Sequence, residues 1–367
     1  HGHPGIIMRN DEEVEIIPVW QIGGPGSSHD STLSWTAQWS DKDADLKLQI
    51  DIALDEAGIL TVETNLLREP ATRLVWLSAG AIPVPAHMPR IIDHGGRWTG
   101  EFQKQERRFS TGQHVRESRE GRTGHADFPG MIFASEACNE TTGECMAVTL
   151  CWSGGHTIVA EEVPDGRRQV QGSFSAPTSN SPRQMKVAWS DTGFNGLSNA
   201  LYTVPRAFSS KRLKQRKIKR PVHYNCWEAV YFRHSVQELK EIATVAADLG
   251  AERFVLDDGW FKGRNDDTTS LGDWVVDRDK YPDGLSPLID HVQAQGMQFG
   301  IWLEPEMVNT ESDLYRAHPD WVHGPVKQPS GRDQFVLDLS IDGVCDYLFD
   351  AISALLNEYP ANYIKWD

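Results

Sequence analysis

Strand-like and helix-like segments alternate along the chain after Pro221, and this alternation constrains the fold more than any other feature. Apolar strand-like runs such as 252–258 and 298–305 are separated by helical stretches such as 235–250 and 285–296. Strands and helices at this spacing are typical of βα units around a parallel sheet. We therefore predict a (β/α) barrel, of which about four strands lie in this chain. A doubly wound sheet is the alternative, but no glycine-rich phosphate-binding motif accompanies the strands.

The first part of the chain has a different pattern. From about residue 30 to 205, short runs of alternating apolar and polar residues, such as 46–54, are separated by Gly, Asp, Asn and Pro. This pattern indicates an all-β domain. Residues 206–220 carry eight basic side chains and are predicted to be a solvated linker. We therefore divide the chain into a β domain at 1–205, this basic linker and an α/β domain at 221–367.

The composition disfavours several classes of partner. With 36 Lys and Arg against 52 Asp and Glu, the formal charge is -16, which repels nucleic acid and anionic membranes. The five Cys lack the spacing of a zinc or redox site, and we expect no disulfide framework, metal or cofactor. Because no apolar run is long enough to span a membrane and no signal peptide is visible, we expect a cytoplasmic protein. The chain lacks an initial Met and ends on the strand-like YIKWD, so we expect it to be a piece of a longer protein.

Acidic and aromatic residues gather where the predicted strands end. In parallel βα folds these carboxyl ends carry the functional groups, because the loops converge there over a rigid sheet. The predicted strand ends are Trp227–Glu228, Asp257–Asp258, Trp302–Glu306 and Lys365–Asp367. The grouping points to a binding or catalytic site at this edge of the sheet.

Lys365 and Asp367 are two residues apart, so their side chains share one face of a strand while Trp366 points to the other. A neighbouring ammonium favours the ionised carboxylate that a nucleophile requires. The alternative is an ordinary ion pair at the end of a strand.

Asp257 and Asp258 are adjacent carboxylates, and Gly259 after them permits a sharp turn. Two like charges this close need hydrogen-bond donors to stay ionised, and sugar hydroxyls are suitable donors. The alternatives are a loop cap and a pair of metal ligands, but no third oxygen ligand follows at a recognised spacing.

Neighbours of these carboxylates are further candidates. Trp227 and Trp302 stand beside acids, and indole faces pack well against the C–H faces of sugars, although core packing is the commoner role of Trp. Glu304 and Glu306 are alternative acids. Because Pro305 lies between them, one of the two is expected to buttress the loop.

The same stretches resemble glycoside hydrolase family 36, which consists mainly of α-galactosidases. The resemblance rests on motifs in the same order, NCWEAVYF, FVLDDGWF, DDTTSLGDW, GIWLEPEM, SDLYRAHPDW, QFVLDLS and YIKWD. Earlier in the chain, RFSTGQHVRESREGRTGH and FPGMIFAS are similar to the amino-terminal β-supersandwich of the family. The resemblance implies a β-supersandwich, the first half of a (β/α)8 TIM barrel, and a homo-oligomer for the intact enzyme.

The resemblance also implies a retaining double displacement on terminal α-galactosides such as raffinose or melibiose, with Asp367 as the nucleophile. In the family, the residue that serves as acid and base lies on a later strand, beyond the last residue of this chain. We therefore expect residues 1–367 alone to be inactive.

The resemblance assigns substrate contacts as well. Asp257 and Asp258 would bind the axial 4-hydroxyl and the 6-hydroxyl of galactose, and Lys365 would bind neighbouring hydroxyls. The further substrate-binding residues that it implies are Trp227, Trp302 and Arg332.

Several activities stay open at this point. An α-N-acetylgalactosaminidase or a galactosyl transglycosylase would use the same fold and nucleophile. A lyase with Lys365 as a Schiff-base amine is a rival from another class, but Asp367 on the same face would keep that amine charged. A catalytically incompetent sugar-binding fragment is the last alternative, because a half barrel exposes an open sheet edge.

Overall fold

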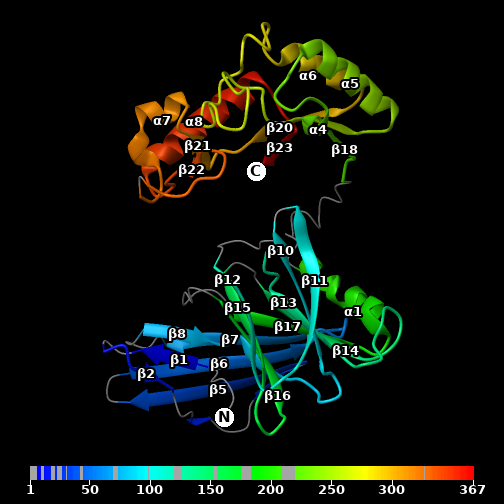
Figure 1. The fold of residues 1–367 in the computed structure, drawn as a ribbon, viewed down its shortest axis with the longest axis vertical. Coiled ribbons are helices and arrows are strands. Elements are labelled where there is room, and N and C mark those ends of the chain that lie inside the picture. Colours follow the sequence, from blue (N-terminus) through cyan, green and yellow to red (C-terminus); the bar gives the residue numbers. More distant parts are fainter. Residues whose placement is uncertain are drawn as a thin grey trace. The chain divides into compact units, whose positions relative to one another are not determined.

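The computed structural model describes residues 6–9, 12–17, 21–22, 27–29, 31–41, 44–68, 73–97, 99–119, 126–151, 155–174, 183–207, 220–325 and 327–367. The chain forms two compact units, residues 1–216 and 217–367 (Figure 1). The first unit consists mainly of strands, and the second of alternating strands and helices. Most of the predicted basic linker, residues 208–219, lies outside the described residues.

Antiparallel strands make up most of the first unit. In chain order they are β1 (Ile6–Arg9), β2 (Glu15–Ile16), β3 (Gln21–Ile22), β4 (Ser27–His29), β5 (Thr32–Asp41), β6 (Ala44–Leu54), β7 (Leu60–Arg68), β8 (Arg73–Leu77), β9 (Gly80–Pro83), β10 (Arg90–Arg97), β11 (Gly100–Arg108), β12 (Gly112–Ser118), β13 (Gly130–Ala134), β14 (Cys145–Cys151), β15 (His156–Glu162), β16 (Arg168–Phe174) and β17 (Arg183–Ser190). The helices α1 (Gly193–Leu201) and α2 (Thr203–Ala207) follow.

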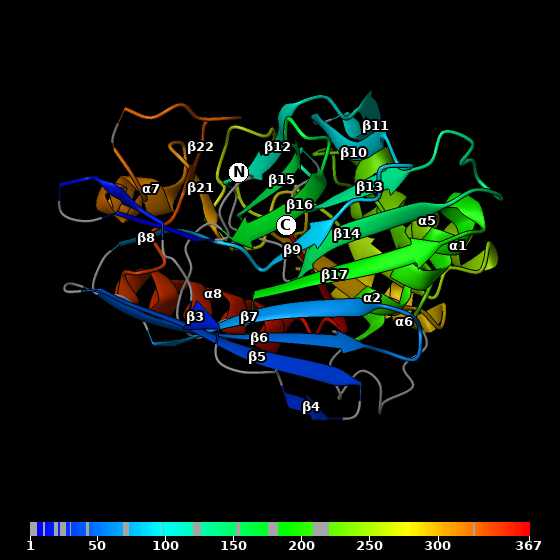
Figure 2. The same cartoon turned by 90° about the horizontal axis from the view of Figure 1, so that it is seen from below.

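These strands form sheets that share apolar cores. In the described residues the largest sheet has ten strands, in the order β11-β10-β13-β14-β17-β7-β6-β5-β3 with β4 paired to β5, and Figure 2 shows β17, β7, β6 and β5 side by side. The smaller sheets have the orders β12-β15-β16-β9 and β2-β1-β8. Phe133 and Met146 of the largest sheet belong to one buried cluster with Ile158 and Val170 of the β12-β15-β16-β9 sheet. Alternate residues of the two sheets therefore meet in a common core.

A parallel sheet is the centre of the second unit. The elements of this unit are β18 (His223–Asn225), α4 (Trp227–Val230), α5 (Val236–Asp248), β19 (Arg253–Leu256), α6 (Ser286–Ala294), β20 (Gln298–Leu303), β21 (Met307–Asn309), α7 (Asp313–Ala317), a 3-10 helix (Pro319–Trp321), β22 (Gln334–Val336), α8 (Asp342–Glu358) and β23 (Tyr363–Trp366). β18, β19, β20 and β23 pair in that order and in parallel, whereas β21 and β22 form a separate antiparallel pair. The parallel pairing confirms the predicted βα pattern.

The helices of the second unit bury one apolar face each. α5 buries Leu239, Ala243 and Ala246, and Figure 1 shows it beside α6, which buries Leu288 and Val292. These residues recur at helical spacing, and all of them except Ala246 belong to the core cluster that includes the strand residues Phe254 and Phe299. None of the helices in the described residues is long and apolar enough to cross a membrane.

The prediction for the first strand end is wrong. β18 ends at Asn225, and Trp227 is the first residue of the short helix α4. The side-chain oxygen of Asn225 accepts the backbone N–H of Trp227 at 2.8 Å, which turns the chain out of the strand. Trp227 and Glu228 therefore begin a helix and do not end a strand.

A sharp turn follows the two carboxylates after β19. Gly259 has a φ of +109°, a conformation that favours glycine. A Cβ added there would lie 3.1 Å from Phe232 Cα and 3.0 Å from His234 Nε2. The turn therefore needs glycine for its backbone conformation and for its lack of a side chain.

Gly259→Ala is expected to lower the free energy of unfolding by about 2–4 kcal/mol, because the positive φ and the close backbone of Phe232 both oppose a side chain. Gly250→Ala is the matched control. Its φ is +94°, but no described atom lies within 4 Å of the added Cβ, so a loss of about 1 kcal/mol is expected. Chemical denaturation measures both variants, and equal losses would show that the close contact does not constrain the turn.

Candidate active site

Strands β19, β20 and β23 end side by side, and an acidic residue follows each directly. Parallel pairing brings their carboxyl ends to one edge of the sheet. The residues that follow are Asp257, Glu304 and Asp367. The backbone N–H of Asp367 also donates to the carbonyl of Leu303 at 2.9 Å, which extends the sheet pairing to this residue. The sheet therefore sets the spacing of these carboxyl groups.

Asp257 is buried and surrounded by donors. Its Oδ2 accepts from Lys365 Nζ at 2.8 Å and from the side-chain amide of Asn225, and its Oδ1 accepts the backbone N–H of Asp258 at 2.9 Å. The Sγ of Cys226 accepts the backbone N–H of Asp257 at 3.3 Å, and burial raises the pKa of this thiol to about 12. The protein itself thus supplies donors that stabilise this carboxylate.

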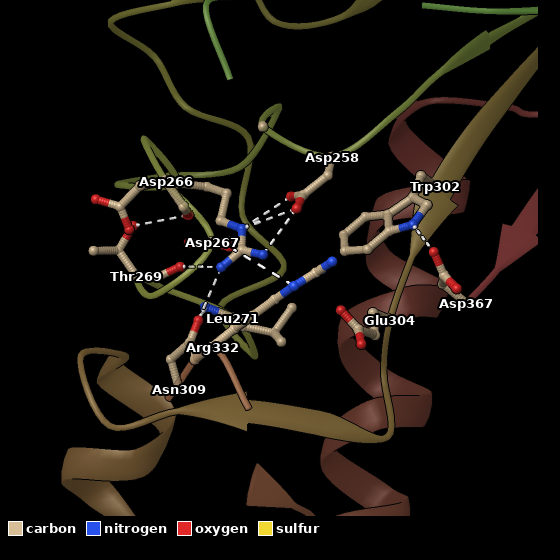
Figure 3. Close-up of polar contacts among 12 residues, drawn as sticks. Asp258, Asp266, Asp267, Thr269, Leu271, Trp302, Glu304, Asn309, Arg332 and Asp367 are labelled. Carbon is tan, nitrogen blue, oxygen red and sulfur yellow. Dashed lines mark hydrogen bonds and ion pairs between the residues drawn. The ribbon is translucent and has the colours of Figure 1, made fainter. Parts of the chain in front are cut away.

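Asp258 forms a buried ion pair with Arg264. The guanidinium donates to the carboxylate from Nε at 2.9 Å and from Nη2 at 2.8 Å. Its Nη1 donates to Asn309 Oδ1 at 2.9 Å and to the carbonyl of Thr269 at 2.7 Å (Figure 3). Burial raises the pKa of Asp258, and the hydrogen bonds from Arg264 oppose that rise. Asp258 is therefore oriented by the Arg264 guanidinium, which Asn309 and Thr269 hold in place.

Lys280 ties the surrounding loops together. Its ammonium donates to the carbonyls of Phe232, Gly259 and Arg264 at 3.2, 2.9 and 2.7 Å. Burial lowers the pKa of this ammonium. Because the acceptors lie on separate turns of the chain, one cation fixes the position of the pair formed by Asp258 and Arg264.

Asp367 is exposed and oriented by an indole. Its Oδ2 accepts from Trp302 Nε1 at 2.9 Å, and the ammonium of Lys365 lies 3.8 Å from the same oxygen. Trp302 is 3% exposed, stacks on Phe261 with ring centroids 6.4 Å apart, and accepts a hydrogen bond on its carbonyl from Trp260 Nε1 at 3.0 Å. A carboxylate that is oriented by a fixed indole and has an ammonium nearby is suited to act as a nucleophile.

Glu304 is half-buried beside these charges. Burial and the charge of Asp367 raise the pKa of Glu304 to about 7, with Asp258 adding to the rise and with Arg264 and Arg332 opposing it. A carboxyl group that titrates near neutrality beside an ionised carboxylate is typical of enzyme active sites.

Two other predicted residues lie at the border of this cluster. Glu306 is exposed and accepts from the indole of Trp366 at the end of β23 at 3.3 Å. Arg332 Nε lies 3.7 Å from Asp267 Oδ2, and both side chains are about half exposed. Figure 3 shows the Arg332 side chain extending toward Glu304.

Trp227 is linked to the cluster through its backbone. Its ring packs edge-on against Tyr231 and Phe232, with centroids 5.1 Å away in each case. Its backbone N–H donates to Asn225, and the amide of Asn225 donates to Asp257.

Sequence reasoning missed the partners of the carboxylates, which are Asn225, Arg264, Lys280 and Asn309. A loop Arg is normally exposed, so nothing in the pattern around Arg264 indicates its burial. The one available signal is that two adjacent carboxylates need a cation, and Arg264 is the first Arg after them in the chain. Across the described residues, no group of three or more His, Cys, Asp or Glu side chains is placed to hold a metal ion.

Comparison with protein families covers nearly the whole chain. Residues 21–177 match the family model of the glycosyl hydrolase family 36 N-terminal domain, and residues 178–367 match the Melibiase family model. The chain is 41% identical over 351 residues to an α-galactosidase of Escherichia coli. This match covers 92% of this chain and 49% of that protein. It is 38% identical over 386 residues to α-galactosidase AgaA of Geobacillus stearothermophilus, covering 100% of this chain and 50% of that protein. The chain therefore belongs to glycoside hydrolase family 36.

Solved structures agree with this membership. A crystal structure of a variant of the same AgaA in complex with raffinose superposes with a TM-score of 0.84 and 29% identity over the structural alignment, covering 100% of this chain and 55% of that chain. A further AgaA variant, in complex with stachyose, superposes with a TM-score of 0.82. The chain thus spans about half the length of the relatives that it matches.

Arg264→Met is expected to lower the free energy of unfolding by about 3–5 kcal/mol, because it leaves Asp258 buried without its cation. The loss should be smaller at acidic pH, where Asp258 is protonated in both the folded and the unfolded state. Denaturant unfolding at several pH values measures the effect.

Arg278→Met is the matched control for this substitution. Arg278 and Glu358 form an ion pair 3.3 Å apart in which both side chains are more than half exposed, so a loss below about 1 kcal/mol is expected. A comparably small loss in Arg264→Met would contradict a structural role for the buried pair.

Proposed function

We propose that this chain carries the galactose-binding and nucleophilic part of a retaining α-galactosidase. The observation that carries the proposal is the carboxylate of Asp367, which is held by the Trp302 indole and flanked by the Lys365 ammonium. It stands at the sheet edge that also bears Asp257 and Asp258. Relatives named as α-galactosidases, and the solved complexes of AgaA variants with raffinose and stachyose, support this substrate class.

For the architecture we propose a β-supersandwich over residues 1–205 and the first half of a (β/α)8 TIM barrel over 221–367. The shared core of two sheets in the first unit supports the former. The parallel order β18-β19-β20-β23, with helices in the connections, supports the latter. The remaining strands would come from the part of the relatives' length that this chain does not span.

The reaction that we propose is a double displacement. Asp367 attacks the anomeric carbon, the glycosidic bond breaks, and water then hydrolyses the galactosyl-enzyme with retention. The indole of Trp302 and the ammonium of Lys365 hold the Asp367 carboxylate in position before the attack. We place the acid and base outside residues 1–367 and expect negligible turnover from these residues alone.

Selectivity for galactose would come from the buried carboxylates. Asp257 and Asp258 accept hydrogen bonds from the axial 4-hydroxyl and the 6-hydroxyl in this proposal. A glucosyl group, whose 4-hydroxyl is equatorial, would lose the hydrogen bond to this carboxylate, at a cost of about 1–3 kcal/mol. The other residues proposed to contact the sugar are Lys365, Trp227, Trp302 and Arg332.

The contacts of Lys365 disfavour the rival lyase. Its ammonium lies 2.8 Å from Asp257 Oδ2 and 3.8 Å from Asp367 Oδ2. The amine is therefore held beside two carboxylates, whereas a Schiff-base amine has to be free to attack a carbonyl carbon.

Incubation of the full-length protein with an activated 2-deoxy-2-fluoro-α-galactosyl donor is expected to label Asp367. The fluorine slows hydrolysis of the galactosyl-enzyme, so the intermediate accumulates. Peptide mass mapping locates the label. A label on another residue, or none on an active enzyme, contradicts the assigned nucleophile.

Asp367→Ala is expected to lower kcat on the order of 10⁴-fold or more, because the covalent step is lost. Azide should restore turnover and give β-galactosyl azide, since it attacks the anomeric carbon from the face that the carboxylate vacates. Asp350→Ala, on the exposed side of α8, is the control and should keep native kcat. Native kcat in Asp367→Ala would exclude Asp367 as the nucleophile.

A further inference from the structure

Glu304 has no role in the reaction described above, although it stands among the residues that carry it out. We propose that Glu304 is a substrate-binding residue of the same pocket, whose protonated carboxyl group donates a hydrogen bond to a hydroxyl group of the bound galactosyl ring. The inference rests on the proposed function and adds to it a contact that depends on protonation.

The strand order places Glu304 between the residues that the galactosyl group is proposed to contact. β20 lies between β19 and β23 in the parallel sheet. A galactosyl group that reaches Asp258 with one hydroxyl and presents its anomeric carbon to Asp367 therefore lies across the end of β20. Glu304 is the first residue beyond that strand, and Figure 3 shows Asp258, Glu304 and Asp367 arranged around the indole of Trp302.

Charged groups from each neighbouring element face Glu304. They are Asp367 after β23, Asp258 after β19, Arg264 in the following loop, and Arg332 in the loop before β22. Arg264 is engaged by Asp258 at 2.8 Å, and Arg332 lies 3.7 Å from Asp267 of the loop that follows β19. Burial and the charge of Asp367 outweigh the two cations, so the pKa of Glu304 rises to about 7.

A protonated Glu304 has a proton to donate. The side-chain amide of Gln334 donates to Glu304 Oε2 at 3.5 Å, and this contact does not use the proton of the carboxyl group. The oxygen of a sugar hydroxyl can accept a hydrogen bond from the protonated carboxyl group of Glu304. Ionised Glu304 would lose this donor and place another negative charge beside Asp258 and Asp367.

The sign of the pH dependence follows from the raised pKa. Glu304 is protonated below pH 7 and becomes ionised above it, so galactose binding is strongest on the acidic side. If only the protonated form binds, the Kd for galactose rises about tenfold between about pH 6 and about pH 8.

Three variants of the full-length protein test this role. Glu304→Gln keeps a donor but cannot ionise, so its Kd should stay within about threefold of the native value at pH 6 and remain constant to about pH 8. Glu304→Ala removes the donor, so its Kd at both pH values should be about tenfold above the native value at pH 6. Glu306→Gln is the matched control, because Glu306 is exposed and bonded to Trp366, and it should keep the native Kd and its pH dependence.

Isothermal titration calorimetry with galactose measures these constants, and hydrolysis of raffinose and of 4-nitrophenyl α-galactoside is measured alongside. If the native Kd is constant with pH, or rises equally in Glu304→Gln, the inference is overturned while the proposed function stands. If Glu304→Gln is slow on raffinose, native-like on the activated aryl substrate and rescued by azide, Glu304 is the acid and base and not a binding residue. A native protein that neither binds galactose nor hydrolyses raffinose would overturn the proposed function itself.

Discussion

Parallel pairing of β19, β20 and β23 is the constraint on which the candidate site depends. Asp257, Glu304 and Asp367 each follow directly after one of these strands, so backbone hydrogen bonds determine their separation. Groups placed on a rigid sheet lose little further freedom when a substrate binds, which is the reason why such edges suit catalysis. The loops then add the donors that each carboxyl group needs.

The distribution of these donors separates the roles of the carboxyl groups. Lys365 and Asn225 stabilise the charge on Asp257, Arg264 stabilises the charge on Asp258, and the indole of Trp302 donates to Asp367. Glu304 has only a long contact from an amide in the described structure and keeps its proton to about pH 7. In our proposal, one edge of a sheet thus carries both hydrogen-bond acceptors and a hydrogen-bond donor for the sugar.

The sequence predicted those features that follow from periodicity and from position along a strand. Alternation at 46–54 predicted β6, and the βα pattern placed Asp257 and Asp367 at strand ends, as the structure shows. The end of strand β18 at Asn225 was not predicted, because it depends on one side-chain hydrogen bond. The burial of Arg264 was not predicted either, because it depends on the path of a loop that has no repeating pattern.

A crystal structure of the full-length Asp367→Asn variant with raffinose would test the central claim, that these strand ends form one galactosyl pocket. We predict that the anomeric carbon lies within about 3.5 Å of the side chain at position 367. The 4-hydroxyl and the 6-hydroxyl should then contact Asp257 and Asp258. A galactosyl ring bound elsewhere, or bound with its anomeric carbon turned away from the end of β23, would contradict the account.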